Sequence, residues 1–170
     1  MKYIRLGCAL VGVLLVASVA SAISPWNAKG EKLYDSIMGL AAKIVAHNKP
    51  TSGPTKGEDV WGGTQWAKEW KKNGTHVAAL SGKRNGKYYT YHIETTDPMM
   101  SFSGGVRVGL SIRELENYLG LALRQIDPEN DGTIDIYASE DGEGGGFGPH
   151  VQIKYRNNKI VSIMADDLHP

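Results

Sequence analysis

The first 22 residues constrain the fold most, because they have the features of an export signal and contain the only cysteine of the chain. Lys2 and Arg5 give a basic start, residues 6–19 form an apolar run, and Ala20-Ser21-Ala22 supplies the small residues of a signal-peptidase site. The run is shorter than the roughly 20 apolar residues of a membrane-spanning helix. We therefore expect cleavage after Ala22 and a periplasmic or secreted mature protein with no transmembrane segment.

The mature chain has 170 − 22 = 148 residues and no cysteine, since Cys8 leaves with the signal peptide. This length is sufficient for one domain with a real core. Without disulfides, an exported domain has to be held together by apolar packing or by a partner. Lipidation at Cys8 is the alternative, but it leaves the apolar run after Cys8 unexplained.

Charge is distributed unevenly along the mature chain. Residues 23–113 contain 13 basic and 7 acidic side chains, and residues 114–170 contain 4 basic and 11 acidic ones. These segments could form two oppositely charged faces that steer a partner. We expect instead that the two signs of charge intermix in the folded protein. No basic run is interleaved with stacking aromatic residues, so we do not expect nucleic-acid binding.

Apolar periodicity predicts a helix over residues 30–47, followed by a linker rich in proline and glycine over residues 48–57. Thr64 is predicted to cap a short helix that runs to Lys72, with Asn73-Gly74 at its end. The domain organisation is thus a signal peptide (1–22), an N-terminal helix with its linker (23–58) and an α+β domain (59–170).

A β-hairpin is predicted over residues 76–95, because Asn85-Gly86 is a strong signal for a two-residue turn. That turn places Ala79 opposite His92 and puts His76 and His92 on opposite faces. The expected core face contains five side chains, namely Ala78, Leu80, Tyr89, Tyr91 and Ile93.

The C-terminal half predicts one helix and three strands. Ser111 and Glu114 form a capping box for a helix over residues 111–119, which Gly120 ends. Strands are expected over residues 134–139, 150–155 and 159–164, with a tight turn at Asn157-Asn158 and a glycine-rich loop over residues 142–149. The resulting fold class is α+β: N-terminal helices and one capped short helix packed on an antiparallel β-sheet.

One stretch resembles a known group of proteins. Val106-Arg107-Val108-Gly109-Leu110-Ser111-Ile112-Arg113-Glu114-Leu115, with Tyr118-Leu119-Gly120 after it, is similar to the opening motif of small exported bacterial domains of the BamE/SmpA and β-lactamase-inhibitor-protein-like group. The closing segment 151–163 is similar to their final strands. The resemblance covers about the last 65 residues. It implies a helix packed on a short antiparallel sheet, and a binding or assembly module rather than an enzyme.

A cluster of tryptophans and lysines is the predicted ligand- or partner-binding site. Indole rings stack on sugars or anchor protein interfaces, and lysines beside them would attract negative charge. The alternative, which we favour, is that the tryptophans pack the short helix onto the sheet. The site residues are Trp61, Trp66, Trp70, Lys71 and Lys72.

A second candidate is a calcium loop that begins at Asp127. Acidic side chains stand at loop positions 1, 3, 5 and 9, namely Asp127, Glu129, Asp131 and Asp135, but Ala138 occupies the position of the bidentate glutamate. An ordinary acidic turn before a strand is therefore the favoured interpretation. None of the five histidines has a partner at helical i, i+4 spacing, so we do not expect a histidine metal site.

No motif for catalysis is present, such as a Gly-x-Ser-x-Gly elbow or a phosphate-binding loop. The sequence therefore predicts an exported, non-enzymatic interaction module of the bacterial cell envelope that binds a protein partner and needs no cofactor. The alternative is a protein that binds a small ligand: a glycan, a peptide or calcium.

Overall fold

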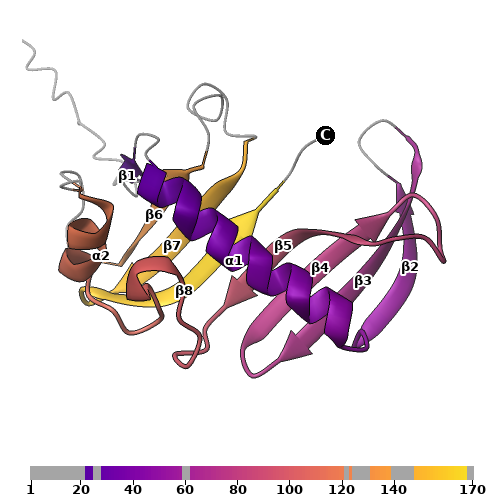
Figure 1. The fold of residues 1–170 in the computed structure, drawn as a ribbon, viewed down its shortest axis with the longest axis horizontal. Helices are drawn as coiled ribbons and strands as arrows, with labels where there is room; N and C mark the ends of the chain where they lie inside the picture. The colour runs from indigo at the N-terminus through magenta and orange to yellow at the C-terminus, as the bar shows by residue number, and fades with distance from the viewer. Residues whose placement is uncertain are drawn as a thin grey trace, which may run out of the picture.

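The computed structural model describes residues 22–24, 28–58, 62–120, 123, 131–138 and 148–167. The strands are β1 (Ala22–Ser24), β2 (Ser52–Glu58), β3 (Thr64–Lys72), β4 (Thr75–Ser81), β5 (Tyr89–Thr95), β6 (Gly132–Tyr137), β7 (His150–Arg156) and β8 (Lys159–Asp166). They build one sheet in the order β1-β6-β7-β8-β5-β4-β3-β2 (Figure 1). β1 pairs with β6 in parallel, and all other pairs are antiparallel.

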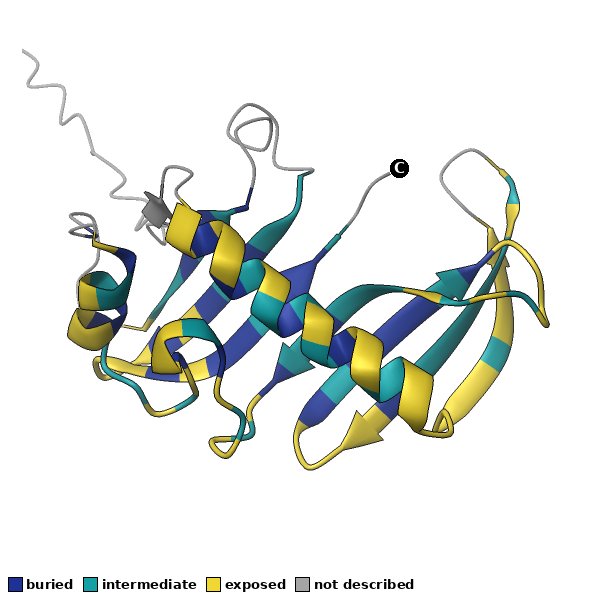
Figure 2. Ribbon diagram, in the orientation of Figure 1, coloured by how far each residue is buried: buried dark blue, intermediate teal, exposed yellow. Residues whose placement is uncertain are grey.

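The helix α1 (Ala28–His47) runs diagonally across one face of this sheet (Figure 1). Leu33, Ile37 and Ala41 recur every four residues and are fully buried, because this spacing places them on one side of the helix. Buried and exposed residues alternate along α1 as a result (Figure 2). The helix residues share one core with the inner-face strand residues Val77, Ile93, Ile134, Ile136, Val151, Ile153 and Ile163. The predicted α+β fold is confirmed.

The short helix α2 (Ile112–Leu119) forms as its motif predicts. The Ser111 hydroxyl accepts a hydrogen bond from the Glu114 backbone amide, and the Glu114 side chain accepts one from the Ser111 amide, which completes the capping box. Gly120 ends the helix in the left-handed conformation at φ +73°. Ile112, Leu115 and Leu119 extend the core, and a 3₁₀ turn, η1 (Ser103–Gly105), precedes α2.

The segment predicted as a linker contains an edge strand instead. Residues 48–51 connect α1 to β2, which pairs with β3 along one side only. Pro54 lies within this strand after a cis peptide bond, next to an irregularity in the pairing. Edge strands tolerate proline because one side of the strand makes no ladder hydrogen bonds.

The predicted short helix from Thr64 to Lys72 is also wrong, because these residues form β3. The strand is paired on both sides, with β2 and β4, and these long-range hydrogen bonds override the helix propensity of its alanine, glutamate and lysine residues. Asn73 and Gly74, at φ +49° and +74°, form the two-residue hairpin turn to β4 rather than a helix stop.

The β4–β5 hairpin exists, but its predicted register is wrong. Asn85-Gly86 lies inside a longer connection, and Ala79 pairs with Thr90 instead of His92. The pairing then shifts, because Tyr91 is an extra residue in β5 and forms a β-bulge. The inner face of β4 consequently carries Val77 and Ala79, rather than the predicted Ala78 and Leu80, while Ile93 lies in the core as predicted.

Because of the same register shift, the predicted placement of two histidines is also wrong. His76 and His92 were expected on opposite faces of the hairpin. They lie on the same face, with their ring centroids 5.4 Å apart.

The three C-terminal strands form as predicted, with ends that differ by a few residues. Asn157 and Asn158, at φ +48° and +59°, make the tight turn between β7 and β8. Residues 1–21 of the predicted signal peptide (1–22) and the glycine-rich residues 142–147 lie outside the described residues. No helix in the described part of the chain is long and apolar enough to cross a membrane.

Candidate functional site

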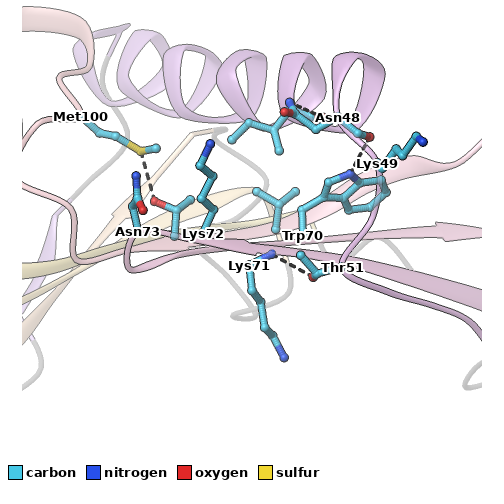
Figure 3. Close-up of a pocket in the computed structure, with 11 residues that line it drawn as sticks. Asn48, Lys49, Thr51, Trp70, Lys71, Lys72, Asn73 and Met100 are labelled. Atoms are coloured by element: carbon cyan, nitrogen blue, oxygen red, sulfur yellow. Dashed lines mark hydrogen bonds between the residues drawn. The ribbon is translucent and has the colours of Figure 1, made fainter.

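A cavity of about 320 Å³ lies where the C-terminal end of α1 meets β3 and β4 (Figure 3). This volume is within the range of small-molecule and side-chain pockets. Its apolar walls come from α1, β3, β4 and the segment after β5, in the residues Ile44, Trp70, Val77 and Met100. The polar lining residues are Asn48, Lys49, Thr51, Lys71, Lys72, Asn73 and Thr75.

Hydrogen bonds fix the helix side of the cavity. The Asn48 side-chain amide donates to the Ile44 carbonyl at 3.0 Å, and the Asn48 backbone amide donates to the same carbonyl at 3.0 Å, which closes the end of α1. The Asn48 carbonyl in turn accepts a hydrogen bond from the Trp70 indole Nε1 at 3.0 Å. Trp70 is buried, and it ties the end of the helix to β3.

The opposite wall is held by a chain of side-chain contacts. The Thr75 hydroxyl lies 3.3 Å from the Met100 sulfur and 2.8 Å from the Thr95 hydroxyl, and both threonines are buried. These contacts fix the methionine against β4. The cavity is therefore preorganised, which lowers the entropic cost of binding a ligand.

Lysines give the cavity mouth a positive charge. Lys72 extends toward the cavity and Lys49 lies at its edge beside Trp70 (Figure 3). Among the described residues, neither lysine forms an ion pair. The end of α1 contributes a partial negative charge of about half an electron, which the two full lysine charges outweigh.

The structure brings together some of the predicted partner-binding residues. Trp70 and Lys72 contribute side chains to the cavity. Lys71 contributes its backbone, because its side chain points away (Figure 3) and its Nζ lies 2.7 Å from Glu69 on the other face of the sheet.

Trp66 does not join this cavity. It lies four positions before Trp70 along β3, a spacing of about 13 Å. It is half-buried, with the Arg84 guanidinium 5.6 Å from its ring centroid. Trp61 lies outside the described residues.

The calcium prediction receives no geometric support. The Asp131 carboxylate accepts a hydrogen bond from Arg156 at 2.8 Å, and Asp135 accepts one from Gln152 at 3.0 Å. The extended backbone of β6 separates these carboxylates by about four strand residues, whereas calcium ligands lie 2.3–2.6 Å from the ion. Asp127 and Glu129 lie outside the described residues.

The half of the sheet that contains the cavity is built from a basic part of the sequence. β2–β5 form one half of the sheet, and β1 with β6–β8 forms the other (Figure 1). Residues 49–95, which supply the first half and its connections, contain 8 basic and 4 acidic residues, a net charge of 8 − 4 = +4. The cavity opens at this basic end.

Sequence reasoning missed Ile44, Asn48, Lys49, Val77 and Met100, which come from segments far apart in the chain. The one local signal was Asn48, because asparagine directly after a helix is favoured at helix ends and so marks where α1 stops beside the cavity. Comparison of the chain with protein-family models, with curated proteins and with solved structures found no match.

Proposed function

We propose that the chain is an exported, non-enzymatic binding module of the bacterial cell envelope, and that its cavity receives an apolar side chain from an acidic segment of a protein partner. The observation that carries this proposal is the combination of an apolar cavity and two lysines, Lys49 and Lys72, with no ion-pair partner among the described residues. An apolar anchor in a preformed cavity supplies affinity, and charges at the rim supply steering and specificity.

An extended partner segment has further contacts within reach. Thr51 lines the cavity and leads directly into β2, the edge strand of the sheet. Edge strands present free backbone groups to which an extended peptide adds. The export signal and the motif over residues 106–120, which resembles exported binding domains, also support a binding role.

The test is a pull-down with paired baits. The purified mature protein and its Lys49→Glu/Lys72→Glu variant are immobilised and exposed to an envelope extract of the source organism. We expect the charge reversal to reduce capture of the partner at least about tenfold, which is 1.4 kcal/mol of binding free energy. The captured protein should contain an acidic segment that, as a synthetic peptide, competes for the bait.

The matched control is Lys32→Glu/Lys43→Glu, which makes the same charge change on exposed positions of α1 outside the cavity. Equal loss with both double variants would show that only net charge matters. Undiminished capture by the Lys49→Glu/Lys72→Glu bait would place the interface elsewhere.

Small-ligand binding is a second candidate function, favoured by a groove on the other flank of α1. Tyr34, Tyr88 and Tyr89 line this space of about 660 Å³, with Asp167 and Lys87 beside them. Tyr89 is 63% exposed, so its ring is available to stack on the apolar face of a sugar. We expect Tyr89→Ala to abolish any binding of soluble cell-wall glycan fragments measured by calorimetry, and Met99→Ala, also at an exposed apolar residue, to leave it unchanged.

A further inference from the structure

The face of the sheet opposite α1 carries a cluster of histidine and carboxylate side chains around a small residue, Ala78. In the strand pairing, His92 on β5 and Glu69 on β3 are the two neighbours of Ala78. His76 lies two residues along β4 and therefore on the same face. Three strands thus place two imidazoles and one carboxylate around the same alanine, whose side chain fills little space.

His92 is oriented by a carboxylate. Its Nδ1 lies 2.5 Å from Asp166 Oδ1, and the two side chains are only 18% and 12% exposed. A carboxylate on one ring nitrogen fixes the orientation and tautomer of an imidazole and leaves the other nitrogen to act as a ligand. This arrangement is the one found behind metal-binding histidines.

His76 has a nitrogen that the protein does not satisfy. Its Nε2 is buried and has no hydrogen-bond partner among the described residues, and the Glu69 carboxylate is 3.8 Å away. Leaving a buried polar atom unsatisfied costs about 1–3 kcal/mol, so such an atom points to an additional partner. Burial lowers the pKa of His76, and Lys71 and His92 lower it further against the opposing effect of Glu69.

The spacing of the rings fits a shared ion. Zinc–nitrogen bonds of about 2.0–2.1 Å at a tetrahedral angle place two imidazole centroids about 5 Å apart. The observed separation between the rings of His76 and His92 is 5.4 Å.

We propose that His76 and His92 bind a zinc-like divalent transition-metal ion through their Nε2 atoms, with the Glu69 carboxylate as third ligand and Asp166 as the carboxylate that orients His92. In the described residues no three such groups already stand together as a metal-binding set. Glu69 is held by Lys71 at 2.7 Å and by Ser52 at 3.2 Å, and it is 37% exposed. These contacts are made by Oε2, whereas Oε1 lies 3.8 Å from His76 Nε2, so a small rotation of this partly exposed side chain brings Oε1 to the ion.

The site is independent of the cavity at the end of α1, since it lies on the other face of the sheet. Zn²⁺ is titrated into the metal-free mature protein by calorimetry, and Co²⁺ is used as a spectroscopic probe of coordination. We expect one equivalent to bind, with the visible absorption of four-coordinate cobalt. His76→Ala and His92→Ala should each weaken binding by more than about 100-fold, and Asp166→Asn by about 10–100-fold.

His150→Ala is the matched control, because His150 lies on the same face but its ring packs against Tyr137 at a centroid distance of 6.3 Å. This variant should bind zinc as the unchanged protein does. Thermal unfolding in metal-free buffer checks folding, and His76→Ala should not lower the unfolding temperature, because it removes an unsatisfied atom. The absence of saturable binding, or binding that survives both His76→Ala and His92→Ala, would overturn the proposal.

Discussion

Replacing Ile37 with alanine is expected to lower the free energy of unfolding by about 2–5 kcal/mol. Ile37 is fully buried at the middle of α1, the long helix that covers the inner face of the central strands. The truncation removes apolar contacts and leaves a cavity that the regular backbone of the helix and the sheet prevents from collapsing. Since domains are stable by only about 5–15 kcal/mol, this loss is a large fraction of the total.

Urea unfolding of residues 23–170, followed by circular dichroism, measures this change. Ile44→Ala is the matched control on the same helix, because Ile44 is half-buried at the cavity and less of its surface leaves water on folding. We expect a clearly smaller loss for Ile44→Ala. A cost below about 1 kcal/mol for Ile37→Ala would mean that α1 does not pack on the sheet in this way.

The second large effect is expected for Gly104→Ala, in the turn before α2. Gly104 has φ +69°, a conformation that costs a residue with a side chain about 1–2 kcal/mol. A Cβ at this position would also overlap the ring of Tyr118. The Tyr118 hydroxyl is fixed at 3.0 Å from both the Lys29 carbonyl and the Ser103 hydroxyl, so the ring moves only if these hydrogen bonds break.

Overpacking adds about 1–3 kcal/mol, for a total of about 2–5 kcal/mol. Gly105→Ala separates the two contributions, because Gly105 has φ +76° with no atom within 4 Å of its would-be Cβ. This control should cost the backbone contribution alone. Equal urea midpoints for the two variants would contradict the close packing of Tyr118 on Gly104.

The sequence predicted those elements in which the apolar spacing and the residues at the ends indicate the same structure. The apolar spacing in residues 30–47 predicted α1, and the capping box at Ser111 predicted α2 almost to the residue. The turn at Asn157-Asn158 predicted the last hairpin for the same reason, since two left-handed residues satisfy a tight turn by themselves.

The two Asn-Gly pairs show where local reasoning fails. Asn73-Gly74 forms a two-residue hairpin turn, although the helix-favouring residues before it predict a helix end. Asn85-Gly86 predicts such a turn but lies in a longer connection between β4 and β5. Both signals are compatible with several conformations, and pairing with distant strands decides between them.

The β-bulge at Tyr91 decides on which face of the hairpin the two histidines lie. One extra residue in β5 changes which side chains share a face, and no residue pattern in the hairpin announced it. The prediction therefore separated His76 from His92. The cavity was predicted only in part, through Trp70 and Lys72, because its remaining walls meet only in the folded chain.

The binding role of the cavity is tested most directly by site-specific crosslinking in the living source organism. A photoreactive amino acid replaces Lys49 at the cavity edge, and in a second strain it replaces Arg113, an exposed residue of α2. We expect irradiation to link the Lys49 position to one envelope protein through an acidic segment, and the Arg113 position to give no such adduct. An adduct from Arg113 without one from Lys49 would contradict the proposed interface.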